Sequence, residues 1–361
     1  MHKLYSASYD ASVYLQQPDQ NTGRDEVLEV GKLYYGSTKD IYRALIKFDT
    51  GLISASIVSG EITGSWKAFL NLKTFTAEEI PVAYTLYANA VSQSWTMGSG
   101  TKFDNVTTDG VSWKYRNGVD AWQSNVSGGA AVFALGTTGS ANAQGGTWYT
   151  GSQASQSFDY TTSDVRMDVT DIFKLWLSGS LPNNGLIIRH GLTNESDVLD
   201  YGAIKFFSKE TNTIYEPNLE IVWDNSSYVT GSLAPVTGSA QEGYKVVLNN
   251  LKSKYLRDSK VKIRVKSRDM FPLKSFSTTF EYDQIKYLPS GSAYYQLEDY
   301  ISGDVIFAFD DYTKLSCDTT SNYFIMDLST LPINRVYKLK LKIVESGIST
   351  VIDDKLIFEI V

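Results

Sequence analysis

Few side chains in this sequence combine in a way that supports catalysis. The chain contains two histidines, His2 and His190, and one cysteine, Cys317. No second ligand lies within sequence reach of His190 for a zinc site, so a hydrogen-bonded or turn histidine is expected there. Cys317 has neither a nearby histidine nor a Cys-x-x-Cys partner to activate its thiolate. The sequence therefore predicts neither a metal site nor a cysteine nucleophile.

Carboxylates are the remaining candidates for chemistry. The acid pairs in FDD (309–311) and IDD (352–354) are interpreted as hairpin turns or strand ends. A glycosidase needs two acids about 5 to 9 Å apart across a cleft, which a sequence does not reveal. The sequence holds no phosphate-binding loop, nucleophile elbow or HExxH motif. We therefore expect no catalytic residues and no cofactor. Calcium is compatible with this composition, but no ligands are predicted because no EF-hand loop is present.

The charge balance argues against nucleic acid as a partner. The 361 residues carry a formal net charge of −7, with a pI of about 5.0. One segment, 260–267, is locally basic, but its charges alternate with Val and Ile. This alternation is typical of the solvated face of a half-buried strand. No stretch approaches the ~20 apolar residues of a membrane span. No export signal is recognised at the start, so synthesis in a cytoplasm is expected.

The elements that must position these side chains are mostly short strands. Tyr occurs 24 times, and the apolar runs are four to eight residues long between Gly, Pro, Asn, Asp or Ser. Only the segment 163–179 has helical spacing, with a cap at Thr170 or Asp168 and an end at Gly179. An all-β chain is predicted. It comprises a jelly-roll sandwich with one short helix over 1–225, a linker over 226–243, and a smaller immunoglobulin-like sandwich over 244–361.

The stretch YRALIKFDT (42–50) is the most informative strand. One face is apolar and is predicted to lie in the core: Ala44, Ile46 and Phe48. The other face is mostly charged: Arg43, Lys47 and Asp49. These charges must lie at an edge or be paired, because an unpaired buried charge is unfavourable. Lys209 and Glu210 are the candidates for that pairing.

These residues resemble the start of the jelly-roll module called the DNRLRE domain. The matching positions are Arg43, Leu45, Ile46, Lys47, Phe48 and Asp49. Later elements also look similar, and the likeness covers about residues 5 to 223: Trp95, Trp113, Trp122, Gly128, Gly129, Asp168, Trp176, Asn184, Gly185, Lys209 and Glu210. The resemblance implies a carbohydrate-binding-like sandwich without catalysis of its own. Members of the family are commonly carried by secreted bacterial proteins.

The second half resembles the C-terminal β-domain of virion structural proteins of large tailed phages. The likeness covers about residues 244 to 361 and rests on these positions: Arg268, Tyr294, Tyr295, 309–316 and 322–324. It implies a virion protein that is made in the host cytoplasm and released by lysis.

The tryptophans are compatible with two roles, namely contact with a ligand or partner and packing in the core. Aromatic rings stack on sugars and also dominate protein interfaces. Trp95, Trp113 and Trp122 fall on the module's own pattern, which favours packing. Trp148, in the Gly-rich segment GGTWYTG, is the better candidate for exposure. The residues considered for contact with a glycan or a partner are Trp148, Tyr149, Trp95 and Trp122.

The leading hypothesis is a non-enzymatic virion structural protein of a tailed bacteriophage, in the neck, tail or capsid decoration. Its partners would be other virion proteins and copies of itself, with no nucleic acid and no membrane. The alternative is a carbohydrate-binding module that serves adsorption to a host or to an extracellular polysaccharide. A polysaccharide-degrading enzyme is the weaker alternative.

Overall fold

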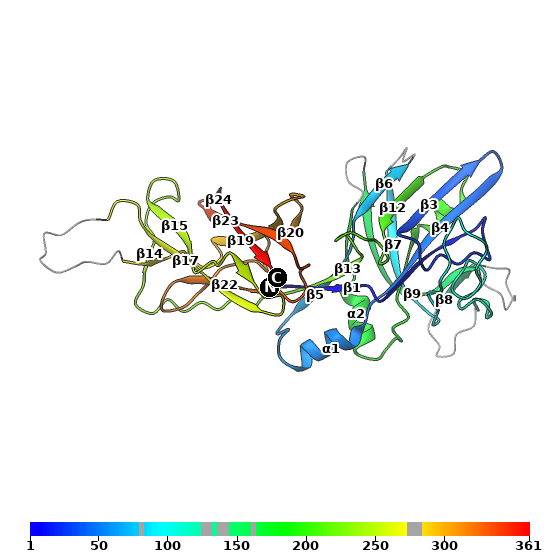
Figure 1. The fold of residues 1–361 in the computed structure, drawn as a ribbon, viewed down its shortest axis with the longest axis horizontal. Helices are drawn as coiled ribbons and strands as arrows, with labels where there is room; N and C mark the ends of the chain where they lie inside the picture. Colours follow the sequence, from blue (N-terminus) through cyan, green and yellow to red (C-terminus); the bar gives the residue numbers. More distant parts are fainter. Residues whose placement is uncertain (79–82, 124–131, 136–143, 160–163, 273–283) are drawn as a thin grey trace, which may run out of the picture. The chain divides into compact units, whose positions relative to one another are not determined.

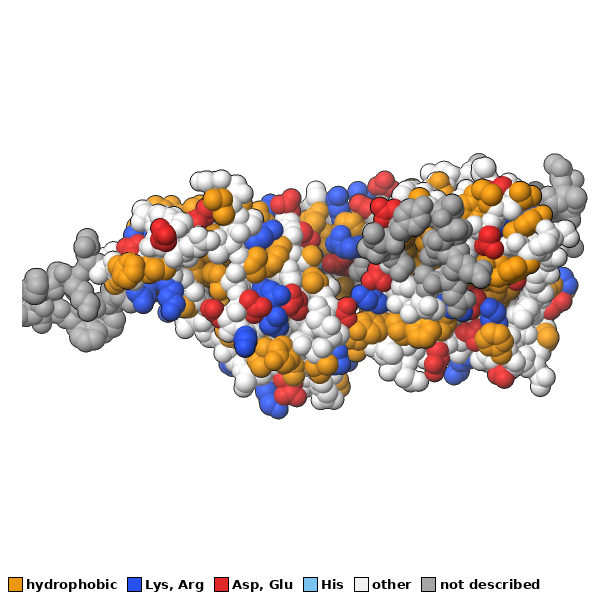
Figure 2. All heavy atoms as spheres, turned by 90° about the horizontal axis from the view of Figure 1, so that it is seen from above, with side chains coloured by type: hydrophobic (Ala, Val, Ile, Leu, Met, Phe, Trp, Pro, Cys, Tyr) orange, Lys and Arg blue, Asp and Glu red, His pale blue; other side chains and the backbone are white. Residues whose placement is uncertain are grey.

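A computed structural model describes residues 1–78, 83–123, 132–135, 144–159, 164–272 and 284–361. The chain is all-β with several sheets, as the sequence predicts (Figure 1). It divides into two compact units that are not simple halves of the sequence. The first unit comprises Tyr5–Ile62 and Lys67–Ile221, and the second comprises Met1–Leu4, Thr63–Trp66 and Val222–Val361. The surface in Figure 2 mixes charged and hydrophobic side chains.

The first unit is built on a nine-stranded sheet. Its order is β6-β12-β3-β4-β11-β7-β9-β8, with β2 also paired to β4. The strands are β2 (Tyr9–Tyr14), β3 (Val27–Tyr35), β4 (Thr38–Lys47), β6 (Thr74–Glu78), β7 (Tyr84–Val91), β8 (Val132–Leu135), β9 (Gln144–Phe158), β11 (Leu186–His190) and β12 (Gly202–Phe207). A four-stranded sheet has the order β1-β13-β5-β10. Its strands are β1 (His2–Ser6), β13 (Asn218–Trp223), β5 (Trp66–Leu72) and β10 (Val165–Asp168).

Strand β4 is buried on both of its faces. Ala44, Ile46 and Phe48 are 0% exposed, which confirms the predicted core face. Arg43 and Leu45, on the opposite face, are also 0% exposed. The reason is a second hydrophobic cluster that covers this face: Ala11, Val13, Ile41, Leu45, Val91, Val111, Trp113, Trp122, Trp148 and Ile187. Val111, Trp113 and Trp122, from the chain between the strands β7 and β9, thus help to cover this face of the sheet.

The charged residues of the predicted outer face therefore lie in different environments. Lys47 is half-buried, with its Nζ 5.9 Å from the centre of the Tyr9 ring. Asp49 is exposed and accepts a hydrogen bond of 2.8 Å from the Gly51 amide, so that it caps a helix. Arg43 is fully enclosed, so of the two predicted arrangements, an edge position or an ion pair, the structure shows the ion pair.

The structure contains the predicted helix and two others among the described residues. Helix α2 (Thr170–Leu177) is confirmed, and Gly179 follows it with φ 72°. Asp168 Oδ1 accepts from the Thr170 amide at 3.0 Å, although Val169 occupies the N-cap position. Helix α1 (Thr50–Val58) and the five-residue helix α3 (Leu192–Ser196) are not predicted by the sequence. The apolar side chains of α1 do not form one stripe, so the helical period is weak.

The second unit is a sandwich of two sheets around one core. One sheet has the order β14-β18-β17-β22-β21, with β15 paired to β17. Its strands are β14 (Ala234–Pro235), β15 (Tyr244–Asn249), β17 (Lys260–Asp269), β18 (Lys286–Tyr287), β21 (Ser316–Cys317) and β22 (Asn322–Asp327). The other has the order β16-β24-β23-β19-β20. Its strands are β16 (Lys254–Tyr255), β19 (Ala293–Asp299), β20 (Val305–Phe307), β23 (Arg335–Glu345) and β24 (Ile348–Ile360). Tyr295 of β19 stacks on Phe324 of β22, with ring centres 4.3 Å apart, so the two sheets share a core.

The segment expected as a free linker, 226–243, is hydrogen-bonded into the second unit. The Val229 amide donates to the Cys317 carbonyl at 2.9 Å. Strand β14 pairs in parallel with β18, and the Val236 amide donates to the Tyr287 carbonyl at 3.0 Å. The second unit also takes in the first residues of the chain, since His2 is 2% exposed and stacks on Phe307.

Candidate functional site

The charge at the centre of β4 is neutralised by a buried ion pair. Arg43 Nε donates to Glu195 Oε1 at 3.0 Å, and Nη2 donates to Oε2 at 2.5 Å. The guanidinium carbon also lies 4.8 Å from the Trp113 ring centre and 5.2 Å from that of Trp148. A two-point contact of this kind, stacked on aromatic faces, suits arginine and not lysine. Glu195 lies on α3, so the pair fastens that helix to the sheet.

The pairing expected from the sequence does not form. Lys209 and Glu210 do not contact Arg43; instead Lys209 Nζ contacts Glu210 Oε1 at 3.2 Å. Glu195 is 152 residues away from Arg43 along the chain and belongs to no recognisable motif. Only the requirement that a buried arginine has a carboxylate could have indicated such a partner.

Gly145 binds the remaining nitrogen of the guanidinium group, Nη1. Arg43 Nη1 donates to the Gly145 carbonyl at 2.5 Å, and the Gly145 amide donates to the Trp113 carbonyl at 2.6 Å. A Cβ at this position would lie 2.5 Å from Arg43 Nη1 and 2.7 Å from the Trp113 ring, and φ is 72°. Both the space and the backbone conformation therefore require glycine.

A second buried cationic side chain lies next to this pair. Arg189 Nη2 donates to Asn89 Oδ1 at 3.0 Å, and its guanidinium carbon is 4.4 Å from the Trp148 ring centre. Burial lowers the pKa of Arg189 to about 10. Trp148 therefore contacts two guanidinium groups and contributes to the interior of the unit.

His190 follows Arg189 and is also enclosed. It is 1% exposed, and neither ring nitrogen has a hydrogen-bond partner among the described residues. Burial lowers its pKa to about 4, so the ring is neutral at pH 7. The ring packs between Tyr84 and Tyr201, with ring centres 5.2 and 5.7 Å away. The sequence predicts a hydrogen-bonded or turn histidine, but His190 is the last residue of strand β11 and its ring makes no hydrogen bond with the residues that the structure describes.

Lys32 fastens the turn that follows α3. Its side chain is 0% exposed, and Nζ donates to Asp197 Oδ1 at 2.9 Å and to the Asp197 carbonyl at 3.0 Å. Burial favours the neutral acid, but hydrogen bonds from Lys32 and Tyr201 outweigh it and hold the pKa of Asp197 below its usual value. The Lys32 ammonium thus binds Asp197 inside the unit and is not available at the surface.

The tryptophans have a packing role. Trp113 and Trp122 are 0% exposed, which confirms the expectation that they pack in the core. Trp148 is 1% exposed and Tyr149 6% exposed, so the expectation that Trp148 is exposed is wrong. The reason is that Trp148 belongs to β9, where it pairs with Val91, and not to a turn. Trp95 is half-buried, and its Nε1 donates to the Asn184 carbonyl at 2.7 Å.

Two acids, Asp25 and Glu29, bind Lys102. The sequence does not indicate this group, because no motif surrounds Lys102. The Lys102 amide donates to Asp25 Oδ1 at 3.0 Å, and its Nζ contacts Glu29 Oε2 at 2.6 Å. The ammonium also lies 4.3 Å from the Tyr14 ring centre and 5.0 Å from that of Tyr42. Burial raises the pKa of Asp25 to about 6. One loop residue thus engages both carboxylates.

Asp10 is a buried acid on strand β2. It is 1% exposed, and burial raises its pKa to about 7. The Lys209 amide donates to its Oδ2 at 2.6 Å. Asp10 lies opposite Ile46 in the ladder, so it points to the core side of the sheet.

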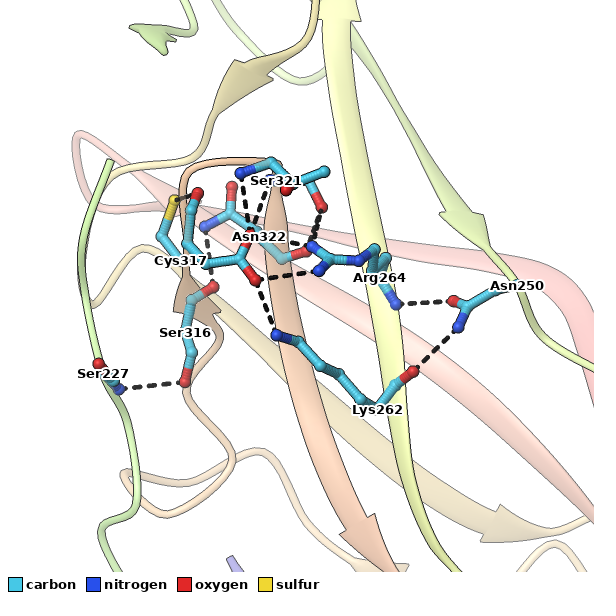
Figure 3. Close-up of polar contacts among 10 residues, drawn as sticks. Ser227, Asn250, Lys262, Arg264, Ser316, Cys317, Ser321 and Asn322 are labelled. Atoms are coloured by element: carbon cyan, nitrogen blue, oxygen red, sulfur yellow. Dashed lines mark hydrogen bonds and ion pairs between the residues drawn. The ribbon is translucent and has the colours of Figure 1, made fainter. Parts of the chain in front are cut away.

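In the second unit, Asp318 joins a turn to strand β17 (Figure 3). Arg264 donates to both of its oxygens, at 2.9 and 3.0 Å, and Lys262 Nζ donates at 2.7 Å. The hydrogen bonds from Arg264, above all, hold the pKa of Asp318 well below its usual range. The neighbouring Cys317 is 1% exposed, and burial raises the pKa of its thiol to about 11. A thiol with these properties is not an effective nucleophile.

Among the residues that the structure describes, no group of three or more His, Cys, Asp or Glu side chains is placed to hold a metal ion. Within the same ranges, no helix is long and apolar enough to cross a membrane.

Comparisons with known proteins identify no family for the chain. No protein-family model matches it, and no curated protein matches it. Among solved structures, it is similar to a DUF4785 family protein from Legionella pneumophila, with 9% identity over 100% of this chain and 65% of that chain. The chain thus spans less than two thirds of the length of that protein. The TM-score is 0.19, which does not indicate a shared fold.

Proposed function

We propose that the chain is a non-enzymatic structural protein of a tailed-phage virion, in the neck, tail or capsid decoration. It would act through protein–protein interfaces with other virion proteins and with copies of itself. The observation that carries the proposal is that buried charged side chains form internal ion pairs. Arg43, Glu195 and Lys32 fasten covering segments to a sheet. This arrangement supports rigidity and leaves these groups unavailable to a substrate.

Exposed apolar side chains support a role in assembly. In the first unit, Phe103 is 88%, Val119 80% and Val106 66% exposed. In the second unit, Leu256 is 72% and Ile348 66% exposed. Large apolar side chains on loops and outer strands are suited to burial at an interface. The first three lie in the loops of 92–157, where we expect contacts, whereas Ile348 lies on β24 and Leu256 directly follows β16, in the C-terminal unit that we also expect to form contacts.

The direct test is the structure of an assembled particle that contains the chain. We expect a symmetric ring or a repeated decoration in which each copy buries more than about 1,000 Å² against its neighbours. A chain attached by a small contact, with Phe103 and Val119 in solvent, would contradict the proposal. Without a particle, light scattering of the purified chain tests whether it self-associates. Phe103→Ser and Val119→Ser should then weaken any oligomer that these loops form.

The alternative function is carbohydrate binding, and one observation favours it. Phe103 is 88% exposed next to Lys102, whose ammonium contacts Glu29. An exposed ring beside charged hydrogen-bonding groups suits a sugar. Binding on a glycan array that Phe103→Ala abolishes would favour this alternative. Turnover of a soluble oligosaccharide, lost in Asp25→Asn, would favour the weaker alternative of a polysaccharide-degrading enzyme.

A further inference from the structure

The outer edge of strand β24 is unpaired along most of its length. Strand β23 pairs with β24 on one side, from Ile348 to Ile360 (Figure 1). On the other side, the two-residue strand β16 pairs only with Glu359 and Ile360. No other strand joins this edge within the ranges that the structure describes. An unpaired edge of this kind can bind another extended chain through its backbone groups.

Only the second half of β24 carries features that discourage such pairing. Asp353, Asp354 and Lys355 are charged and exposed. Lys355 also has φ 54° and lies at a register shift between β23 and β24. Charges and bulges are the usual protection of an edge strand. The first half, the uncharged segment 348–352 (ISTVI), has neither.

Apolar side chains of the uncharged segment are exposed. Ile348 is 66% exposed and Val351 is 52% exposed. The two residues are three apart in a strand, so their side chains lie on opposite faces. Exposed apolar residues beside an unpaired edge favour association with another strand.

The turn before β24 determines which backbone groups point outward. Glu345 pairs with Ile348 across the turn 346–347, whose two residues have φ values of 49° and 81°. These angles are those of a type I′ hairpin, in which the closing pair is hydrogen-bonded. Hydrogen-bonded pairs alternate along an antiparallel ladder, so Ser349 and Val351 direct their N–H and C=O groups to the outer edge.

We propose that the uncharged segment pairs with the same segment of a second copy of the chain, antiparallel and around a twofold axis at Thr350. In this register Ser349 of each copy lies opposite Val351 of the other. Each of these pairs exchanges both of its N–H···O hydrogen bonds, because their backbone groups are the ones that point outward. Such a contact is closed, since both copies use the same surface.

The distribution of charge supports this register and this occupant. Asp353 and Asp354 lie opposite uncharged turn residues of the other copy. A twofold axis at either aspartate would instead bring that residue opposite itself, and like charges directly opposite are destabilising. At the proposed axis two threonines meet, which is a favourable cross-strand pair. The chain carries a net charge of −7, so two copies approach most easily through a segment that is uncharged and complementary to itself.

The inference deepens the proposed assembly role and rests on it, because it names one surface for the contact between copies. The paired segment is short, so the isolated chain should associate weakly. Copies that other contacts hold together in a particle should pair more completely, because their effective concentration is higher.

Disulfide trapping of the full chain tests the register. Two copies of Thr350 would form a non-hydrogen-bonded pair with Cα atoms about 4.5 Å apart, which is within reach of a disulfide. Thr350→Cys should therefore give a covalent dimer on a non-reducing gel after mild oxidation. The matched control is Ile348→Cys, because the two copies of residue 348 would be about 14 Å apart. Ile348 is the more exposed of the two, so random collisions would favour the control. Cys317 is 1% exposed, so the wild type should give no dimer.

Changes at Val351 test the edge itself, in the Thr350→Cys background. Val351→Pro removes an outward N–H and keeps the ladder to β23, and it should slow dimer formation about tenfold or more. Val351→Lys should have the same effect by placing a charge on the edge, and it covers the case in which proline disturbs the strand. The control is Ile357→Lys, which is 42% exposed on the same strand beyond the bulge and should leave the rate unchanged. Circular dichroism and melting show which variants keep the fold.

Equal rates for Thr350→Cys and Ile348→Cys would overturn the register, and so would a rate that Val351→Lys leaves unchanged. Light scattering separates this inference from the assembly role. If the chain self-associates equally well with and without Val351→Lys, pairing at β24 is overturned and assembly through other surfaces stands. A strand of a different virion protein on 348–352 in a particle would overturn the assignment to a second copy. Absence of both trapping and self-association would count against both proposals.

Discussion

The buried pair Arg43–Glu195 allows a quantitative test of how the first unit is held together. Both side chains are enclosed, at 0% and 4% exposure, so removal of either one leaves a buried charge without its partner. We therefore expect Arg43→Met and Glu195→Met each to reduce the free energy of unfolding by about 3 to 5 kcal/mol. Arg43→Met also removes two contacts with tryptophan rings, which are worth about 0.5 to 2 kcal/mol each. Its effect should therefore be the larger.

The double variant decides whether the two residues act as a pair. With both charges gone, no uncompensated ion remains, so the loss should be smaller than the sum of the single losses by about 2 kcal/mol or more. Urea unfolding monitored by tryptophan fluorescence measures all four proteins, because Trp113 and Trp148 lie against the guanidinium. The control is the surface pair Lys67 and Asp168, at 3.7 Å and about half exposed, where coupling of about 0 to 1 kcal/mol is expected. Additive losses for Arg43 and Glu195 would refute the reasoning.

Three further outcomes follow from burial. Phe48→Ala should cost about 3 to 5 kcal/mol of unfolding free energy, measured by urea unfolding, and wild-type stability would mean that the ring is not in the core. Asp10 has a pKa raised from 3.8 to about 7, so the folded state binds its proton more tightly and loses stability as pH rises between these values. The stability of Asp10→Asn relative to wild type should therefore increase by about 2 to 4 kcal/mol from acid to pH 8, and a constant difference would be the contrary result. Cys317, with its thiol pKa of about 11, should resist iodoacetamide in the folded chain and react in urea, and rapid native labelling would show that the site opens.

Local alternation was sufficient to predict several of the strands. The inward face of β4 and the half-buried strand β17 follow from the period of two in their sequences. Helix α2 follows from its apolar spacing. These features depend on neighbours along the chain, which a single sequence contains in full.

Contacts over long sequence separations were not predictable in this way. The partner of Arg43 lies on α3, and the cover over β4 comes from the chain after β7. Trp148 was misassigned because a Gly-rich neighbourhood suggests a turn, whereas Gly145 allows a close approach to the buried Arg43 and Gly146 a close approach to Ile187. Lys102, Asp25 and Glu29 come together only in the folded unit.

The path of the chain through the two units also limits how the molecule can be divided. Because Met1–Leu4 and Thr63–Trp66 belong to the same unit as Val222–Val361, the backbone passes from one unit to the other four times. A single cut after residue 221 would not yield two complete parts: the C-terminal fragment would lack its first strand residues, and the N-terminal fragment would keep them without their neighbours. During synthesis, more than 200 further residues must likewise be made before residues 1–4 can pack in their own unit. The two units therefore pack separately, but a single cut of the chain cannot separate them.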